Sequence, residues 1–338
     1  MTNRLVLRLI CSLILFVSTL QAYAASTGTR GGVLLKFNPG ARVNAMGDVF
    51  TAIADDMYAI HYNPAGLGIL SSNEISAMYV NDVMDTDYGF IGGARPLKNG
   101  ACVGTSIIYF DGGQIDIVGG ALAGTRAAQS DFLVNLACGK ELRQGFSIGG
   151  NVKVFYSTLV EQYHAVALGM DMGGLYKFSG DKLSLGLCLQ NIGTGIVYKD
   201  TADSMPLALR AGAAWYTVIK KDYKFLTGLD IIYPYPDNMR ANAGFEILCR
   251  DFFALRMGYK FGYDIDGFTC GIGLKNKLYK IDYGFSTTGE LASYLHRISL
   301  SMLFTDEELK EILSKEKRAK ENKPVKHTKR KITKRKRR

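Results

Sequence analysis

The side chains that most often carry catalysis are sparse in this sequence. Its histidines are His61, His164, His296 and His327, and they lie far apart. There is no Gly-x-Ser-x-Gly nucleophile motif, no His-Glu-x-x-His metal motif and no glycine-rich phosphate loop. A hydrolase built on His164 and a serine is the only enzymatic alternative. We therefore predict a protein that is not an enzyme, with no catalytic residues, no metal site and no cofactor.

Binding of charged groups is the other chemistry that the residues suggest. In "FFALRMGYKF", Arg256 and Lys260 share one side with small residues, and the large apolar residues take the other. Charged residues in such positions are Lys153, Asp171, Arg210, Asp230, Glu246, Arg256, Lys260, Lys280, Asp282 and Arg297. Because both signs occur on neighbouring segments, we expect most of them to form ion pairs. Arg256 or Lys260 could instead bind a ligand's carboxylate.

The alternation that positions these residues predicts strands from Glu74 onward. Large apolar and aromatic residues on one face, with Gly, Ala, Ser and charge on the other, are typical of a barrel whose apolar face meets lipid. The predicted strands are Glu74–Val80, Tyr88–Pro96, Ala101–Phe110, Asp131–Leu142, Phe146–Ser157, His164–Phe178, Lys182–Ile192, Pro206–Val218, Tyr223–Tyr233, Arg240–Cys249, Phe252–Gly262, Phe268–Asn276, Tyr279–Thr287 and His296–Phe304. The expected fold is all-β, a transmembrane antiparallel β-barrel of about 14 strands.

The connectors between the predicted strands fall into two kinds. Every second connector is tight, such as "KNG", "RQG" and "RD". Most of the others are longer, chiefly Asp111–Ser130 and Gly193–Met205. Short turns at one rim and long loops at the other are typical of outer-membrane barrels, with the short turns in the periplasm. We therefore predict a location in the cell outer membrane, in contact with its lipid, and an even strand number places the C-terminal tail in the periplasm.

The N-terminal end has the features of a secretion signal. Arg4 and Arg8 precede the apolar run Leu9–Leu20, and Ala22-Tyr23-Ala24 has the small-x-small pattern of a cleavage site. We assign residues 1–24 to a signal peptide. Five cysteines follow it, an odd number without a Cys-x-x-Cys pair, which argues against a disulfide framework or a zinc site.

The basic character of the chain lies at its ends. The tail Thr305–Arg338 carries a net charge of +9 and the signal +2, which leaves residues 25–304 at about −1 of the whole chain's +10. The barrel is therefore not a nucleic-acid binder. Thr305 and Glu308 form a capping box that predicts a short helix, followed by a disordered Lys/Arg-rich segment. Expected partners of the tail are anionic lipid, peptidoglycan or an acidic protein, with simple solvation as the alternative.

Residues 25–70 precede the first predicted strand and do not alternate. A barrel of this size leaves a hole in its centre, so we predict that this segment is a hatch, or plug, inside the lumen of the barrel at 71–304. The turn Asn63-Pro64-Ala65-Gly66 either gates the lumen or serves only as a rigid turn. Arg42, Asp55 and Asp56 either bind a substrate headgroup or fix the hatch through charge pairs with basic groups of the lumen.

The stretch "GARVNAMGDVFTAIADDMYAIHYNPAGL", residues 40–67, resembles the N-terminal plug of the PorV/PorQ (UPF0164-type) outer-membrane proteins. These are related to the FadL-like long-chain fatty acid transporters. The matching positions are Gly40, Arg42, Met46-Gly47, Ala54-Asp55-Asp56 and Asn63 to Leu67, and "HRISLSMLF" at His296–Phe304 is similar to the family's last strand. Asp48 and Val49 depart from the pattern, where small residues are usual, and so does the Lys/Arg tail.

The resemblance implies a FadL-like barrel with an N-terminal hatch and leaves two functions open. The first is uptake of a hydrophobic ligand, such as a long-chain fatty acid, through a hatch-gated lumen. The second is a PorV-like accessory role in type IX protein secretion, with a secreted-protein or secretion-system partner held by the long loops. Fold-level analogy cannot choose between them.

Overall fold

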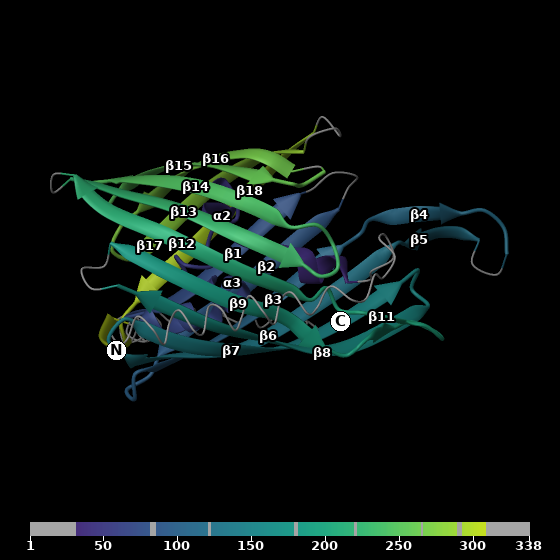
Figure 1. Ribbon diagram of the computed structural model, residues 1–338. Coiled ribbons are helices and arrows are strands. Elements are labelled where there is room, and N and C mark those ends of the chain that lie inside the picture. The colour runs from purple at the N-terminus through teal and green to yellow at the C-terminus, as the bar shows by residue number, and fades with distance from the viewer. Residues whose placement is uncertain are drawn as a thin grey trace, which may run out of the picture. The chain divides into compact units, whose positions relative to one another are not determined.

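The fold is a closed antiparallel barrel, seen in a computed structural model (Figure 1). The structure describes residues 32–81, 86–120, 123–178, 182–219, 222–264, 266–288 and 293–308. The predicted signal peptide at 1–24 and nearly all of the tail lie outside these ranges. In ring order the strands are β1-β18-β17-β16-β15-β14-β13-β12-β9-β8-β7-β6-β3-β2. The prediction of an all-β barrel of 14 strands is therefore confirmed.

Each predicted strand is present, with ends that differ by at most a few residues. The barrel strands are β1 (Asn73–Asn81), β2 (Asp87–Pro96), β3 (Ala101–Asp111), β6 (Gln129–Arg143), β7 (Phe146–Leu159), β8 (Tyr163–Lys177), β9 (Leu183–Gly193), β12 (Ala208–Ile219), β13 (Tyr223–Pro234), β14 (Arg240–Cys249), β15 (Phe253–Phe261), β16 (Asp266–Lys275), β17 (Tyr279–Thr288) and β18 (Ser293–Phe304). Neighbouring strands pair in simple up-and-down hairpins, which matches the alternation of short and long connectors in the sequence.

The two longest loops contain hairpins that the sequence reasoning did not predict. β4 (Gln114–Ile117) pairs with β5 (Gly124–Ala127), and β10 (Ile196–Val197) pairs with β11 (Ala202–Asp203). In Figure 1 the β4–β5 hairpin extends beyond the ends of the neighbouring barrel strands. The long loops are thus partly ordered as small two-stranded sheets.

The outer face of the barrel is apolar. Side chains such as Leu136, Val152 and Ile298 point outward and are more than half exposed, while the residues next to them in sequence are buried. Water-exposed apolar surface on this scale is unfavourable in a soluble protein, so the face requires an apolar surrounding. No helix in the described part of the chain is long and apolar enough to span a bilayer.

The segment before β1 lies inside the barrel, and we call residues 32–70 the plug segment. It consists of η2 (Val33–Lys36), α2 (Ala41–Ala45), α3 (Ala59–Tyr62) and η3 (Pro64–Ile69). Its backbone bonds to inward side chains on well-separated strands: Ala41 N–H donates to Ser299 Oγ of β18 (2.9 Å), and the Ala52 carbonyl accepts from Ser184 Oγ of β9 (2.7 Å). Most of its apolar side chains are fully buried, including Phe50, Ile53, Tyr62 and Leu67.

Inward-facing glycines of the wall make room for this segment. At Gly244 a Cβ atom would overlap the carbonyl oxygen of Met46, and at Gly149 it would overlap the backbone of Pro64. The backbone of the segment comes equally close at Gly139, Gly186, Gly258 and Gly284, and a side chain of the segment does so at Gly173 and Gly228. These positions account for a part of the chain's 38 glycines. The wall is therefore shaped to the backbone of the plug segment.

Of the residues that follow β18, the structure describes 305–308. Thr305 N–H donates to Glu308 Oε2 (2.8 Å), and Glu308 N–H donates to Thr305 Oγ1 (3.2 Å). This is the reciprocal capping box that the sequence predicts. The Lys/Arg-rich part of the tail lies outside the described residues.

Candidate functional site

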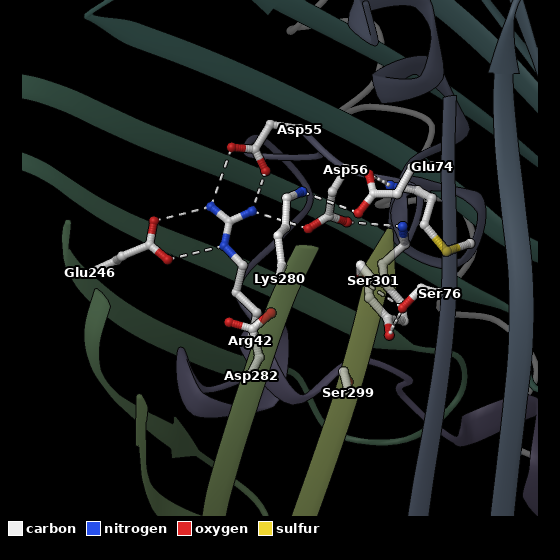
Figure 2. A network of polar contacts seen from close by, with 12 residues as sticks. Arg42, Asp55, Asp56, Glu74, Ser76, Glu246, Lys280, Asp282, Ser299 and Ser301 are labelled. Carbon is white, nitrogen blue, oxygen red and sulfur yellow. Dashed lines mark hydrogen bonds and ion pairs between the residues drawn. The ribbon is translucent and has the colours of Figure 1, made fainter. Parts of the chain in front are cut away.

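Arg42 of α2 is the centre of a buried ion-pair network (Figure 2). Its guanidinium donates to Asp55 Oδ1 (2.6 Å) and Asp56 Oδ2 (3.1 Å) within the plug segment. It also makes a two-point contact with Glu246 of β14, at 3.0 and 3.1 Å. Paired N–H donors that meet both oxygens of a carboxylate give a strong and directional bond. Arg42 thus joins two parts of the plug segment to the barrel wall.

A second layer of charges surrounds this contact. Arg256 of β15 donates to Glu246 (2.5 Å) and to Asp282 of β17 (2.7 Å). Close to Asp56, Lys280 donates to Glu74 Oε1 (3.1 Å), and Glu74 Oε2 accepts from the backbone N–H of Met57 (3.2 Å). Two acidic wall residues, Glu74 and Glu246, therefore bind the plug segment directly.

Burial and charge shift the titration of the plug carboxylates in opposite directions. For Asp55, burial would raise the pKa, but the Arg42 guanidinium outweighs it and holds the pKa below its usual value. For Asp56, burial and then the nearby Glu74 carboxylate raise the pKa to about 7, despite the contact with Arg42. One carboxylate of the Asp55-Asp56 pair is thus firmly ionised, and the other titrates near neutral pH.

A second group of contacts holds the middle of the plug segment. Asp48 accepts from Lys260 of β15 (2.6 Å), and both side chains are almost fully buried. Asp230 of β13 accepts from the N–H groups of Phe50 (3.1 Å) and Thr51 (3.0 Å) and also pairs with Arg210 (3.3 Å). These contacts fix the chain between α2 and α3 to strands β12, β13 and β15, on both sides of β14.

The Asn63-Pro64-Ala65-Gly66 turn lies against β6, β7 and β8 and does not join the ion-pair network. Asn63 Oδ1 caps η3 by accepting from Ala65 N–H (3.2 Å), and Nδ2 donates to the carbonyls of Thr51 (2.8 Å) and Gly174 (3.1 Å). A Cβ at Gly66 would overlap the carbonyl of Ala54. The turn therefore folds the segment onto itself and binds it to β8.

A cavity of about 210 Å³ opens beside the Arg42 network. It lies at the short-turn end of the lumen, because Lys224 and Lys280 are the second residues of β13 and β17 and Lys275 is the last residue of β16. Its lining consists of Arg42, Asp55, Tyr216, Lys224, Phe225, Leu226, Glu246, Leu248, Ala254, Arg256, Gly273, Leu274, Lys275, Lys280 and Asp282. The Arg42 network forms one wall of this cavity.

The inward-facing charges that alternation predicts are buried or partly buried in the lumen. Six site residues come together, namely Arg42, Asp55, Asp56, Glu246, Arg256 and Asp282. Arg210, Asp230 and Lys260 form the second group, and Lys153 pairs with Asp171 (2.8 Å). Arg297 donates to the carbonyl of Asn38 (2.5 Å).

One expectation about partners differs from the structure: Asp55 and Asp56 bind Arg42 of their own segment, and not basic groups of the wall. Arg256 and Lys260 are paired with acidic residues of the chain, as expected for most of the inward charges. Sequence reasoning missed Asp48 and Glu74 as contacts. The only signal for Asp48 was its departure from the small residue usual at that position.

Comparisons with known proteins add to this geometry at the level of the fold. No family model matches the sequence, and a search of curated proteins finds no match. The structure is similar to the toluene transporter TodX of Pseudomonas putida, with a TM-score of 0.56 and 13% identity over 79% of this chain and 99% of that one. The toluene transporter TbuX of Ralstonia pickettii gives a TM-score of 0.54 and 11% identity over 79% and 97%.

A FadL homologue from Pseudomonas aeruginosa is also similar, with a TM-score of 0.50 and 11% identity over 78% of this chain and 97% of that one. At these identities the likeness establishes the fold alone. The expected relation to FadL-like barrels is therefore confirmed at that level. Membership of the PorV/PorQ group stays a prediction.

Proposed function

We propose that the protein is an outer-membrane channel of FadL-like architecture that takes up hydrophobic small molecules. The observation that carries this proposal is a closed barrel, apolar outside, whose inward side chains hold the plug segment through polar contacts. The likeness to two toluene transporters and a FadL homologue supports it. In this proposal the apolar face meets outer-membrane lipid, and the short turns and the tail lie in the periplasm.

The substrates to test first follow from those relatives. Toluene represents the monoaromatic hydrocarbons named for two of them, and a long-chain fatty acid represents the FadL-like transporters. Either molecule would enter from the long-loop end and would have to pass the plug segment. Because the segment fills the lumen at the level of its wall contacts, transport requires that the segment move or rearrange.

Residues Val49 and Gly228 allow a direct test of that movement. Val49 Cγ1 lies 2.6 Å from the position of a Cβ at Gly228 on β13, so cysteines at both positions would bring their sulfur atoms within bonding reach. The double variant Val49→Cys/Gly228→Cys would be made in a background without the native cysteines. Uptake of radiolabelled substrate is measured in Gram-negative cells that lack their own channel of this kind.

The proposal predicts that oxidation stops uptake in the double variant and that a reductant restores it, with neither single variant responding. The intact outer membrane is needed, because hydrophobic molecules cross plain phospholipid vesicles without a channel. If the disulfide forms in full and uptake continues at the reduced rate, gating by the plug segment is wrong. If the reduced protein gives no uptake of either substrate above cells without it, the channel proposal fails.

A second candidate function, a PorV-like scaffold for protein secretion, is favoured by the ordered long loops. The β4–β5 hairpin is exposed, and Val118 between its strands is 98% exposed. A scaffold of this kind would hold a protein partner on the loops. Removal of residues 113–128 should then abolish co-purification of a stoichiometric partner and leave uptake unchanged. Loss of uptake with no partner in either sample would count against this candidate.

A further inference from the structure

The cavity at the short-turn end of the lumen has more basic than acidic residues in its lining. Five of the lining residues are basic and three are acidic. Each acidic one has an arginine partner: Asp55 pairs with Arg42, Asp282 with Arg256, and Glu246 with both arginines. Among the basic ones, Lys280 pairs with Glu74 and Lys224 with Asp251.

Lys275 is the basic lining residue that has no such partner. In the described part of the chain its side chain forms no ion pair, and its backbone N–H donates to the Phe252 carbonyl (2.8 Å). It is the last residue of β16 and stands opposite Lys280 of β17, so two ammonium groups flank the same edge of the cavity. An ammonium group in this setting is available to an incoming anion.

Tyr216 supplies a second and independent sign of a ligand. Its hydroxyl is buried and has no hydrogen-bond partner among the described residues, and the side chain lines the same cavity. Buried hydroxyls are almost always satisfied in folded proteins, so an orphan that faces a cavity indicates a missing partner. Lys177 lies 5.9 Å from the Tyr216 ring centroid and adds a further positive charge nearby.

The size and remaining lining of the cavity limit what can bind. Its volume of about 210 Å³ is below the range of roughly 300 Å³ and above that holds drug-sized ligands. Leu226 and Leu248, which share the inward face with Glu246, provide apolar side chains in the lining. The lining therefore suits a small molecule with one apolar side and one anionic group, and a long alkyl chain would not fit.

We propose that this cavity is a binding site for a small organic anion, held by the Lys275 ammonium and the Tyr216 hydroxyl with its apolar part against Leu226 and Leu248. The site faces the end of the lumen opposite to the one at which a transported molecule would enter. Binding there does not depend on transport, since Lys275 and Tyr216 are residues of the barrel wall outside the Arg42 ion pairs.

Benzoate is the probe, because it combines a carboxylate with a small apolar ring. Isothermal titration calorimetry on the full chain in uncharged detergent compares benzoate with inorganic phosphate and with neutral benzyl alcohol. We expect saturable binding of benzoate and much weaker binding of the other two. The variants are Lys275→Gln and Tyr216→Phe, each of which removes one contact. Lys277→Gln, a neighbouring turn lysine that does not line the cavity, is the matched control.

Loss of one charge-assisted hydrogen bond should weaken benzoate binding about tenfold or more in Lys275→Gln. Tyr216→Phe should weaken it several-fold and leave the thermal stability of the free protein unchanged or raised, because the orphan hydroxyl is gone. The proposal is overturned if benzoate does not bind, or if benzyl alcohol binds equally well. It is also overturned if Lys277→Gln weakens binding as much as Lys275→Gln, which would indicate general attraction to a basic rim.

Discussion

Replacement of Arg42 by alanine should release the plug segment from the wall while leaving the barrel folded. The substitution leaves Asp55, Asp56 and Glu246 without their shared cation, and the Arg42 side chain is only 12% exposed. Removal of one partner of a buried ion pair costs about 3–5 kcal/mol, since the remaining charge stays desolvated. At about 1.4 kcal/mol for each factor of ten, the open population of the plug segment should rise by roughly two to four orders of magnitude.

Hydrogen exchange followed by mass spectrometry measures this population directly. Peptides from residues 40–70 should lose protection in Arg42→Ala, and barrel strands such as β7 should keep theirs. Arg126→Ala is the matched control, because Arg126 pairs with Glu161 at 3.1 Å with both side chains well exposed. Exposed pairs contribute about 0–1 kcal/mol, so this variant should change little. Unchanged protection of the plug segment in Arg42→Ala, or an equal loss in Arg126→Ala, would refute the central role of Arg42.

Three further predictions concern the same segment. Gly244→Ala should lower the melting temperature, because the new Cβ would overlap the Met46 carbonyl. Gly174→Ala is the control and should not lower it, because the space around Gly174 is open. Equal melting temperatures of the two variants would contradict the close fit. Asp48→Ala should destabilise by about 3–5 kcal/mol by stranding Lys260, and Asp48→Ala/Lys260→Met should recover most of the loss in urea unfolding. Folding raises the pKa of Asp56 from 3.8 to about 7, so the folded segment binds a proton that the unfolded chain releases. Proton binding by Asp56 therefore stabilises the folded segment. This contribution is complete below pH 3.8 and is lost as pH rises through about 7. Hydrogen exchange at pH 5 and pH 8 should show the difference, and Asp56→Asn should abolish it.

The strands and their inward faces could be predicted from the sequence because the period of two is a local property. Arg256 and Lys260 are separated by an even number of residues on β15, so alternation alone puts them on one face. Their partners could not be predicted. Glu246 lies in register with Arg256 on the neighbouring strand β14, but Asp282 lies on β17, two strands away from β15. Asp48 reaches Lys260 only because the plug segment crosses the lumen.

The contacts of the plug segment required the tertiary structure. Asp55 and Asp56 meet Arg42 because the segment turns back on itself between α2 and α3. The β4–β5 hairpin had a local signal that was overlooked, since "QIDI" alternates and is followed by Gly119-Gly120. The inward glycines are also visible in the sequence, but their meaning depends on which backbone approaches them.

The measurement that tests the channel proposal most directly is the initial rate of uptake of labelled toluene and of a labelled long-chain fatty acid. It is made in cells whose intact outer membrane contains the wild-type protein, beside cells without it. The proposal predicts saturable uptake of at least one of the two and, for the purified protein in planar bilayers, little ion conductance through the filled lumen. Uptake no faster than in the cells without the protein, or the large steady conductance of an open pore, would contradict it.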